Sequence, residues 1–262
     1  MDFRFKAGKL PLLISMPHAG TDIPDDVAAN LMPCAAARAD TDWHLPELYG
    51  FAEEMGASML SARWSRYLID LNRPPENTNL YPGQDTTGLC PVDTFGRERL
   101  YREGMEPDEA EVRRRLDLYW RPYHAQLRAE LDRLLALHGR VVLWEAHSIA
   151  SQVPRFFEGR LPDLNFGTAD GKSCSLALEG NMIKLAQAQD QFSFVFNGRF
   201  KGGHITRFYG NAAAGVHAIQ LEMVQCLYMN ETAPFDYRPD LAGQVQPLLR
   251  ELLGAAVEWV RT

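Results

Sequence analysis

Short apolar runs alternate in this chain with longer segments of helical periodicity, and this alternation restricts the fold more than any other feature. The runs at 10–16, 140–148 and 216–223 each have the length of a buried strand. Residues 106–139 instead carry apolar side chains at helical spacing, with acidic residues at the start and Gly139 at the end. Strands that alternate with helices predict an α/β fold with a mostly parallel or mixed central sheet and helices on both faces.

The remaining segments predict shorter elements and long connections. We expect a helix that starts near Asp42, an interruption of the helix 106–139 at Pro122, and a single α/β domain over residues 1–262. The further elements expected are helices at 42–57, 173–189 and the last twenty residues, one bent strand or two at 57–73, and a strand at 192–197. Loops are expected at 74–106 and 149–172, and a glycine-rich hairpin or loop at 198–215.

Composition and charge exclude several classes of protein. Of the 262 residues, 46% are hydrophobic and 23% are charged, which is typical of a folded globular protein. The net charge of -7 leaves no broad basic surface for nucleic acid or anionic lipid. The four cysteines form no C-x-x-C pair, and the sequence contains no convincing signal peptide or membrane segment. We therefore expect a cytoplasmic protein without nucleic-acid or membrane partners, and the oligomeric state is left open.

An ionisable residue lies at or just beyond the end of each of the three apolar runs. These residues are His18, His147 and Glu222. In open α/β sheets ligands bind beyond the carboxyl ends of the strands, so parallel neighbours would bring these side chains together. Two imidazoles and a carboxylate can hold Zn²⁺, and a further carboxylate can take a proton from water. The alternative for each histidine is a purely structural hydrogen bond.

The third metal ligand is left open among the polar residues of the stretch ADTDWH. Asp40, Asp42 and His44 are all candidates, and Asp42 has the alternative role of capping the following helix. Glu145 lies two residues before His147 and would share its face of a strand. We expect Glu145 either to orient that histidine or to be an ordinary polar strand residue.

Two further stretches carry residues that suit an anionic ligand. Arg66, Asn72 and Arg73 lie in SRYLIDLNR, and arginine binds carboxylates through two parallel hydrogen bonds. His204 and Arg207 lie in GGHITRFYG, where paired glycines would allow the backbone to approach a ligand closely or simply form a tight turn.

Taken together, these motifs resemble the N-formylglutamate amidohydrolase family from about residue 10 to about residue 230. The resemblance implies hydrolysis of N-formyl-L-glutamate to formate and L-glutamate, a step of histidine degradation. It also implies a fold similar to zinc-dependent exopeptidases and amidases. The motifs that carry it, in chain order, are PHAG, DTDWHLPELY, SRYLIDLNRPP, YWRPYH, LWEAHS, NGRFKGGHITRFYG and AIQLEM.

The resemblance also implies roles for single residues. His18, Asp42 and His147 match the positions of metal ligands, although glutamate is more usual at the second position, and Glu222 matches the base. The implied cofactor is one divalent metal ion, Zn²⁺ in the first place, although Co²⁺, Mn²⁺ or Fe²⁺ suit the same donors. Asp40, His44, Glu145 and His204 stay as alternative ligands or as supports of the site.

The substrate implied by the resemblance is a small molecule with two carboxylates, so the site must supply fixed cations. Arg66, Arg73 and Arg207, together with Asn72, are the predicted substrate-binding residues. Two other functions are compatible with the same residues. One is an amidohydrolase for another N-acyl amino acid, and the other is a non-catalytic dicarboxylate-binding protein.

Overall fold

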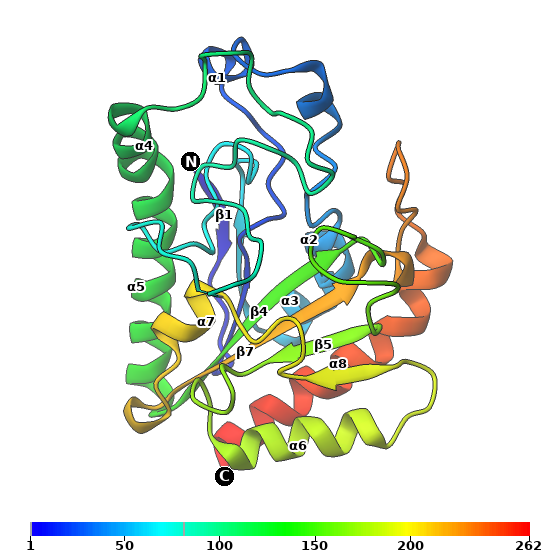
Figure 1. The fold of residues 1–262 in the computed structure, drawn as a ribbon. Coiled ribbons are helices and arrows are strands. Elements are labelled where there is room, and N and C mark those ends of the chain that lie inside the picture. Colours follow the sequence, from blue (N-terminus) through cyan, green and yellow to red (C-terminus); the bar gives the residue numbers. More distant parts are fainter. Residues whose placement is uncertain (1, 81) are drawn as a thin grey trace.

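A seven-stranded mixed sheet forms the centre of the computed structural model, which describes residues 2–80 and 82–262 (Figure 1). The order of the strands across the sheet is β1-β3-β2-β4-β7-β5-β6. β2 pairs in parallel with β3 and β4, β4 with β7, and β5 with β6, whereas β1 and β5 run antiparallel to β3 and β7. The strands are β1 (Phe3–Lys6), β2 (Leu12–Met16), β3 (Ser58–Ala62), β4 (Val141–Ile149), β5 (Leu164–Gly167), β6 (Phe194–Phe196) and β7 (Val216–Val224).

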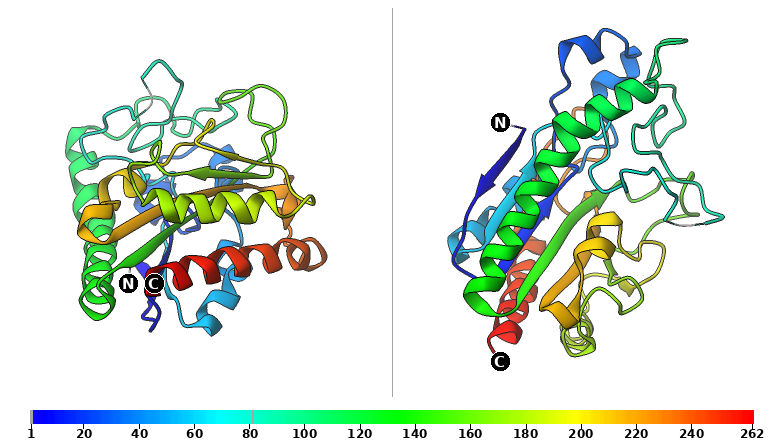
Figure 2. Two further views of the ribbon diagram at one scale, coloured as in Figure 1. Left: turned by 90° about the horizontal axis from the view of Figure 1, so that it is seen from below. Right: turned by 90° about the vertical axis from the view of Figure 1, so that its left-hand side faces the viewer.

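Helices cover both faces of this sheet, as the sequence predicts. α3, α6 and α8 pack on one face, and α5 and α7 pack on the other, with a separate apolar cluster between each layer and the sheet (Figures 1 and 2). The α-helices are α1 (Asp25–Ala28), α2 (Leu45–Leu48), α3 (Gly50–Met55), α4 (Glu109–Arg115), α5 (Arg121–His138), α6 (Leu176–Gln187), α7 (His204–Tyr209) and α8 (Pro239–Arg261). The fold is therefore a mixed α/β fold, as expected.

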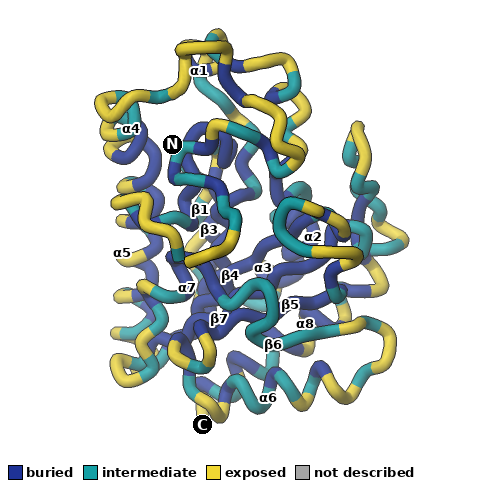
Figure 3. Tube along the Cα trace, in the orientation of Figure 1, coloured by how far each residue is buried: buried dark blue, intermediate teal, exposed yellow. Residues whose placement is uncertain are grey.

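The strands beneath α5 and α7 change from apolar to polar along their length. On β4, Leu143 packs in the apolar cluster of this face, and the next residues on the same side are Glu145 and His147. On β7, Ala218 belongs to the same cluster, and Glu222 follows on its face. The central strands are buried along their whole length (Figure 3). The polar side chains are thus buried at the carboxyl ends of parallel strands.

Several local predictions are wrong, and each error has a tertiary cause. The stretch 42–57 does not form one helix: α2 ends at Leu48 and α3 starts at Gly50. Asp42 lies in the loop before α2, where its backbone N–H donates to the carbonyl of His18. The strand predicted within 57–73 ends at Ala62, and the residues that follow form irregular structure held by other elements.

The expected loops also contain elements that local sequence does not reveal. The stretch 149–172 includes β5, which is buried because β6 and β7 flank it, and 198–215 includes the short helix α7. Strand β1 precedes the first predicted strand and pairs at the edge of the sheet. The described residues of 74–106 contain only isolated bridges, in agreement with the predicted loop.

The long helix at 106–139 is interrupted just before Pro122, as expected. The interruption is a single π turn, Leu116–Trp120, between α4 and α5. The backbone N–H of Arg121 donates to the carbonyl of Leu116, five residues earlier. Such wider turns are a common way to interrupt a helix without ending it.

Among the described residues, no helix has both the length and the hydropathy needed to span a membrane.

Leu131 and Leu137 on α5 form a matched pair for testing this core. Leu131 is fully buried and Leu137 is 62% exposed. We expect Leu131→Ala to lower the free energy of unfolding by about 2–5 kcal/mol, because the truncation leaves a cavity. Leu137→Ala should change it by less than about 0.5 kcal/mol. Urea unfolding measures both, and equal effects would contradict the packing of α5 described above.

Candidate metal centre

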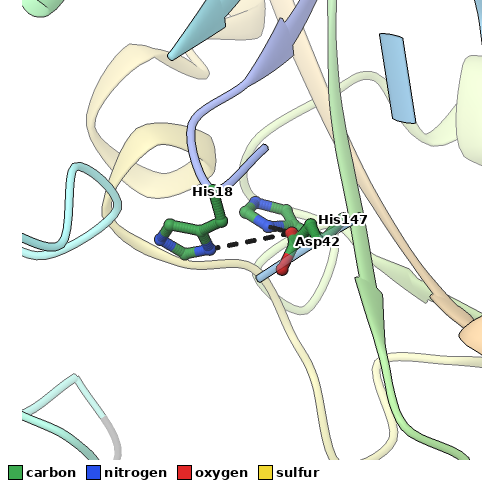
Figure 4. A group of neighbouring side chains, drawn as sticks. All are labelled: His18, Asp42 and His147. Atoms are coloured by element: carbon green, nitrogen blue, oxygen red, sulfur yellow. Dashed lines mark hydrogen bonds and ion pairs between the residues drawn. The ribbon is translucent and has the colours of Figure 1, made fainter. Parts of the chain in front are cut away.

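Three buried side chains from separate parts of the chain meet beside the carboxyl ends of β2 and β4. His18 lies in the loop after β2, Asp42 in the loop before α2, and His147 on β4 (Figure 4). One ligand atom from each lies within 4.8 Å of the others. The backbone N–H of Asp42 donates to the carbonyl of His18 at 3.1 Å, which ties the two loops together. The group has the donor types and the spacing to hold one metal ion.

Asp40 and His44 do not belong to this group among the described residues. The Asp40 carboxylate accepts a hydrogen bond from the backbone N–H of Phe95 at 2.8 Å, and burial raises its pKa to about 6. His44 Nε2 donates to the carbonyl of Phe235 at 2.7 Å. Both side chains therefore support loops next to the centre, and Asp42 is the residue of the stretch 40–44 that faces the two histidines.

The contacts of His18 leave one ring nitrogen facing the centre. Its Nε2 donates to Asp70 Oδ1 at 2.6 Å, and Arg66 Nη2 donates to the other oxygen of the same carboxylate at 2.8 Å. Nδ1 faces Asp42, 3.8 Å from its Oδ2, and accepts a hydrogen bond from Arg66 Nη1 at 3.3 Å. Burial, together with the charge of Arg66, lowers the pKa of His18 to about 4. The ring is therefore neutral near pH 7, which is the form that binds metals.

His147 is surrounded by acidic groups. Its Nδ1 donates to Asp42 Oδ2 at 2.9 Å, and its Nε2 lies 3.5 Å from Glu145 Oε1 and 3.0 Å from Asn72 Nδ2. Burial by itself lowers the pKa of His147, but the contacts with Asp42 and Glu145 raise it well above its usual range. The acidic groups around His147 thus favour positive charge in this part of the site.

A cation fits the charges and the hydrogen bonding of these residues. The carboxyl groups of Asp42, Asp70, Glu145 and Glu222 are all buried around the two histidines. Glu145 Oε2 is buried and has no hydrogen-bond partner in the described part of the chain. Buried carboxylates are costly unless positive charge compensates them, so a divalent ion suits this environment.

Glu222 lies beside the centre because of strand register. It is paired with His147 across the parallel β4–β7 ladder, and it lines the same cavity as the three candidate ligands. Burial raises the pKa of Glu222 to about 8; the charge of Asp42 adds to this effect, and His147 opposes it. A carboxyl group with a pKa near neutrality can both accept and release a proton.

The cavity contains most of the predicted anion-binding residues, but their roles differ. Arg66, Asn72 and Arg73 line it. Arg66 is engaged by Asp70, and its guanidinium carbon lies 4.7 Å from the centre of the Phe95 ring. Arg73 Nε donates to the carbonyl of Thr87 at 3.0 Å.

Arg207 and His204 are not among the described residues that line the cavity. Arg207 Nε donates to the carbonyl of Gly202 at 2.8 Å. The His204 ring lies 5.1 Å from that of Phe208, on the same helix, and 5.8 Å from that of Trp120, between ring centres. Both residues lie on α7, a short helix where the sequence predicted a hairpin or loop.

Sequence reasoning missed Arg199, which lines the cavity with Phe156. Its Nε donates to the carbonyl of Phe156 at 2.7 Å, and its guanidinium carbon lies 5.7 Å from that ring. The only sequence signal was an arginine before the glycine pair in NGRFKGG, and nothing local distinguishes it from Arg207.

The fold and site together define a mixed α/β protein with a buried His–Asp–His centre in a cavity lined by arginines. A family model described as N-formylglutamate amidohydrolase matches residues 10–229, and the chain belongs to this family.

Two relatives and one solved structure are similar over almost the whole chain. The N-formylglutamate deformylase of Pseudomonas aeruginosa is 52% identical, covering 98% of this chain and 96% of the relative. That of Pseudomonas putida is 50% identical, covering 97% and 95%. The crystal structure of N-formylglutamate amidohydrolase from Ralstonia eutropha JMP134 is 25% identical, with a TM-score of 0.84 over 99% of this chain and 98% of that one.

The raised pKa of Glu222 predicts a pH-dependent stability in the metal-free protein. Its ordinary pKa is 4.5 and the folded value is about 8, so the native state binds this proton more tightly than the unfolded chain. The resulting stability is present below about pH 4.5 and is lost as the pH rises to about 8. In Glu222→Gln the neutral form persists, so its unfolding free energy should fall less steeply over this range.

Urea unfolding in the presence of a chelator, at several pH values between about 5 and 8, measures this difference. Glu258→Gln, an exposed change on α8, is the matched control and should keep the wild-type slope. Parallel slopes for wild type and Glu222→Gln would show that the buried carboxyl group titrates normally.

Proposed function

We propose that this protein hydrolyses N-formyl-L-glutamate to formate and L-glutamate. The observation that carries the proposal is the meeting of His18, Asp42 and His147 in one cavity with Glu222 and several arginines. Two relatives at 50% identity or more are named N-formylglutamate deformylase, which supports this substrate. The proposal joins a centre suited to hydrolysis with cations suited to a dicarboxylate.

His18, Asp42 and His147 are the residues that would hold the metal, and Zn²⁺ is the ion that we propose. Two imidazole nitrogens and one carboxylate oxygen are a typical donor set of catalytic zinc sites. When bound, such an ion supplies Lewis acidity and makes water a stronger acid near neutral pH. Asp70 has a supporting part here, because its hydrogen bond with Nε2 keeps His18 Nδ1 directed at the centre.

Glu222 is the proposed carrier of the proton in the reaction. Its carboxylate takes a proton from the attacking water as the new C–O bond forms at the formyl carbon. The same carboxyl group then gives the proton to the nitrogen, and the C–N bond breaks to release formate and L-glutamate. Since Glu222 is paired with His147 in the β4–β7 ladder and lines the same cavity, both transfers are accessible to one group.

We assign the carboxylates of the substrate to Arg73 and Arg199, which line the cavity on separate loops. Arg66 is instead a positioning residue, since its guanidinium is bound to Asp70 and lies 3.9 Å from Asp42. The phenyl rings of Phe95 and Phe156, whose centres lie 4.9 Å apart, would pack against the aliphatic part of the substrate.

A formate-release assay on N-formyl-L-glutamate tests the proposed function. We expect activity that is lost on chelation and restored by Zn²⁺. Glu222→Gln should lower kcat by about 10²–10⁴-fold, because proton transfer is removed, while metal analysis finds the ion retained. Glu258→Gln serves as the control and should retain wild-type turnover.

Each alternative predicts a different outcome of this assay. If the protein releases a carboxylic acid from other N-acyl amino acids but not from N-formyl-L-glutamate, it is an amidohydrolase with a different substrate. Dicarboxylate binding without turnover or bound metal would identify a binding protein and overturn the proposal.

Arg73→Ala and Arg207→Ala compare an arginine that lines the cavity with one that is not among its lining residues. We expect Arg73→Ala to raise KM about tenfold or more, because a charge-assisted hydrogen bond contributes roughly 1.5–3 kcal/mol. Arg207→Ala should leave KM within about twofold. Steady-state kinetics measure both, and the reverse order would place the carboxylate of the substrate near α7.

A further inference from the structure

We propose that the π turn in the long helix is a positioning device for the site. It places Arg115, Trp120 and His124 on one helix face, where their side chains hold residues 66–73, which we call the support segment. This segment supplies Arg66, Asp70, Asn72 and Arg73 to the centre and its cavity. The inference rests on the proposed function for its kinetic consequences, and metal affinity tests it independently.

Side chains of the long helix, rather than a neighbouring strand, bind the backbone of the support segment. Strand β3 ends at Ala62, and the chain then becomes irregular. Three carbonyls of the segment accept hydrogen bonds from this helix. The pairs are Arg115 Nη1 with Leu68 O at 2.9 Å, His124 Nε2 with Leu71 O at 2.8 Å, and Trp120 Nε1 with Arg73 O at 3.1 Å.

The π turn brings the three donors to one face. In an α-helix each residue turns by about 100°, so Arg115 and Trp120 would lie about 140° apart around the axis. The turn Leu116–Trp120 contains one additional residue, which reduces this separation to about 40°. Trp120 and His124 are four residues apart and lie about 40° from each other. If residues 116–120 were α-helical instead, Arg115 would lie about 140° from Trp120 and would not share a face with it.

The contacts within this face define the state of His124. Its Nε2–H donates to Leu71 O, so Nδ1 is the acceptor of the Tyr209 hydroxyl at 2.9 Å. Burial lowers the pKa of His124 to about 3, which keeps the ring neutral. The Trp120 ring stacks on it with 3.5 Å between ring centres. Both nitrogens of His124 are therefore used in positioning.

Helix α7 holds the support segment from the other side. The backbone N–H of His204 donates to the carbonyl of Asn72 at 3.2 Å, and that of Ile205 donates to Asn72 Oδ1 at 2.8 Å. Gly203 makes this approach possible, because a Cβ there would lie 2.4 Å from Asn72 Nδ2. With its amide oxygen engaged, Asn72 keeps Nδ2 directed at His147.

His124→Gln and His124→Phe distinguish positioning from packing. Glutamine can still donate from its Nε2 to Leu71 O but loses the aromatic stack, whereas phenylalanine keeps the stack and loses the donor. We expect Gln to retain at least fivefold more kcat/KM than Phe, and Phe to weaken Zn²⁺ affinity about tenfold through misplacement of Asp70. A packing role predicts the opposite order, with Phe equal to or better than Gln in both measurements.

Trp120→Phe and Tyr119→Phe give a second test within the same π turn. Trp120→Phe removes the donor to Arg73 O and should raise KM at least fivefold. Tyr119→Phe, at the neighbouring buried aromatic residue, should leave KM within about twofold. Equal KM values for Trp120→Phe and Tyr119→Phe would overturn the inference. Unfolding curves of both variants ensure that only folded protein is compared.

The two proposals fail in different ways. Wild-type protein that releases no formate overturns the proposed function, and the ratio of Zn²⁺ affinities between His124→Gln and His124→Phe still decides the inference. If the wild-type protein is active and His124→Phe has kcat/KM and Zn²⁺ affinity at least equal to those of His124→Gln, only the inference about the π turn is overturned.

Discussion

The burial of carboxyl groups around two imidazoles is the constraint on which the rest of the site depends. A carboxylate removed from water requires positive charge or hydrogen-bond donors. Asp70 is bound by Arg66 and His18, and Asp42 is bound by His147, so each compensating contact also fixes the direction of a ring. Glu222 is buried beside these groups, and burial raises its pKa. The same interactions that make the burial tolerable therefore align the atoms that could hold a cation.

The sheet converts this local chemistry into a defined geometry. Parallel pairing of β4 with β7 places Glu222 directly beside His147, and both lie on the face covered by α5 and α7. A slip of one residue would turn Glu222 toward the apolar layer beneath α8, because successive side chains of a strand face opposite sides. The fully buried Trp144 and Ile219 pack on that opposite side, so the hydrophobic pattern secures the register of the polar pair.

The irregular segments supply the remaining groups of the site, and rigid elements hold them. Residues 66–73 are fixed between the long helix and α7, whose backbone and side chains bond their carbonyls. Arg155 ties its own loop to the segment 85–93, because its guanidinium binds both Asp85, which lines the cavity, and Asp93. Residues on loops can thus reach the centre from several directions, while their positions are set by the scaffold.

Sequence by itself determined the buried strands β2, β4 and β7, the long helix, and the expectation that His18 and His147 meet at strand ends with a residue of the stretch 40–44, because periodicity and ordered motifs are local properties. Tertiary structure alone decided that Asp42, rather than Asp40 or His44, faces the histidines. It also decided that 198–215 contains a helix and that Arg199, rather than Arg207, lines the cavity. The hydrophobic pattern of a helix or strand indicates which of its sides is buried. Which loops lie next to each other depends instead on contacts between residues far apart in the chain.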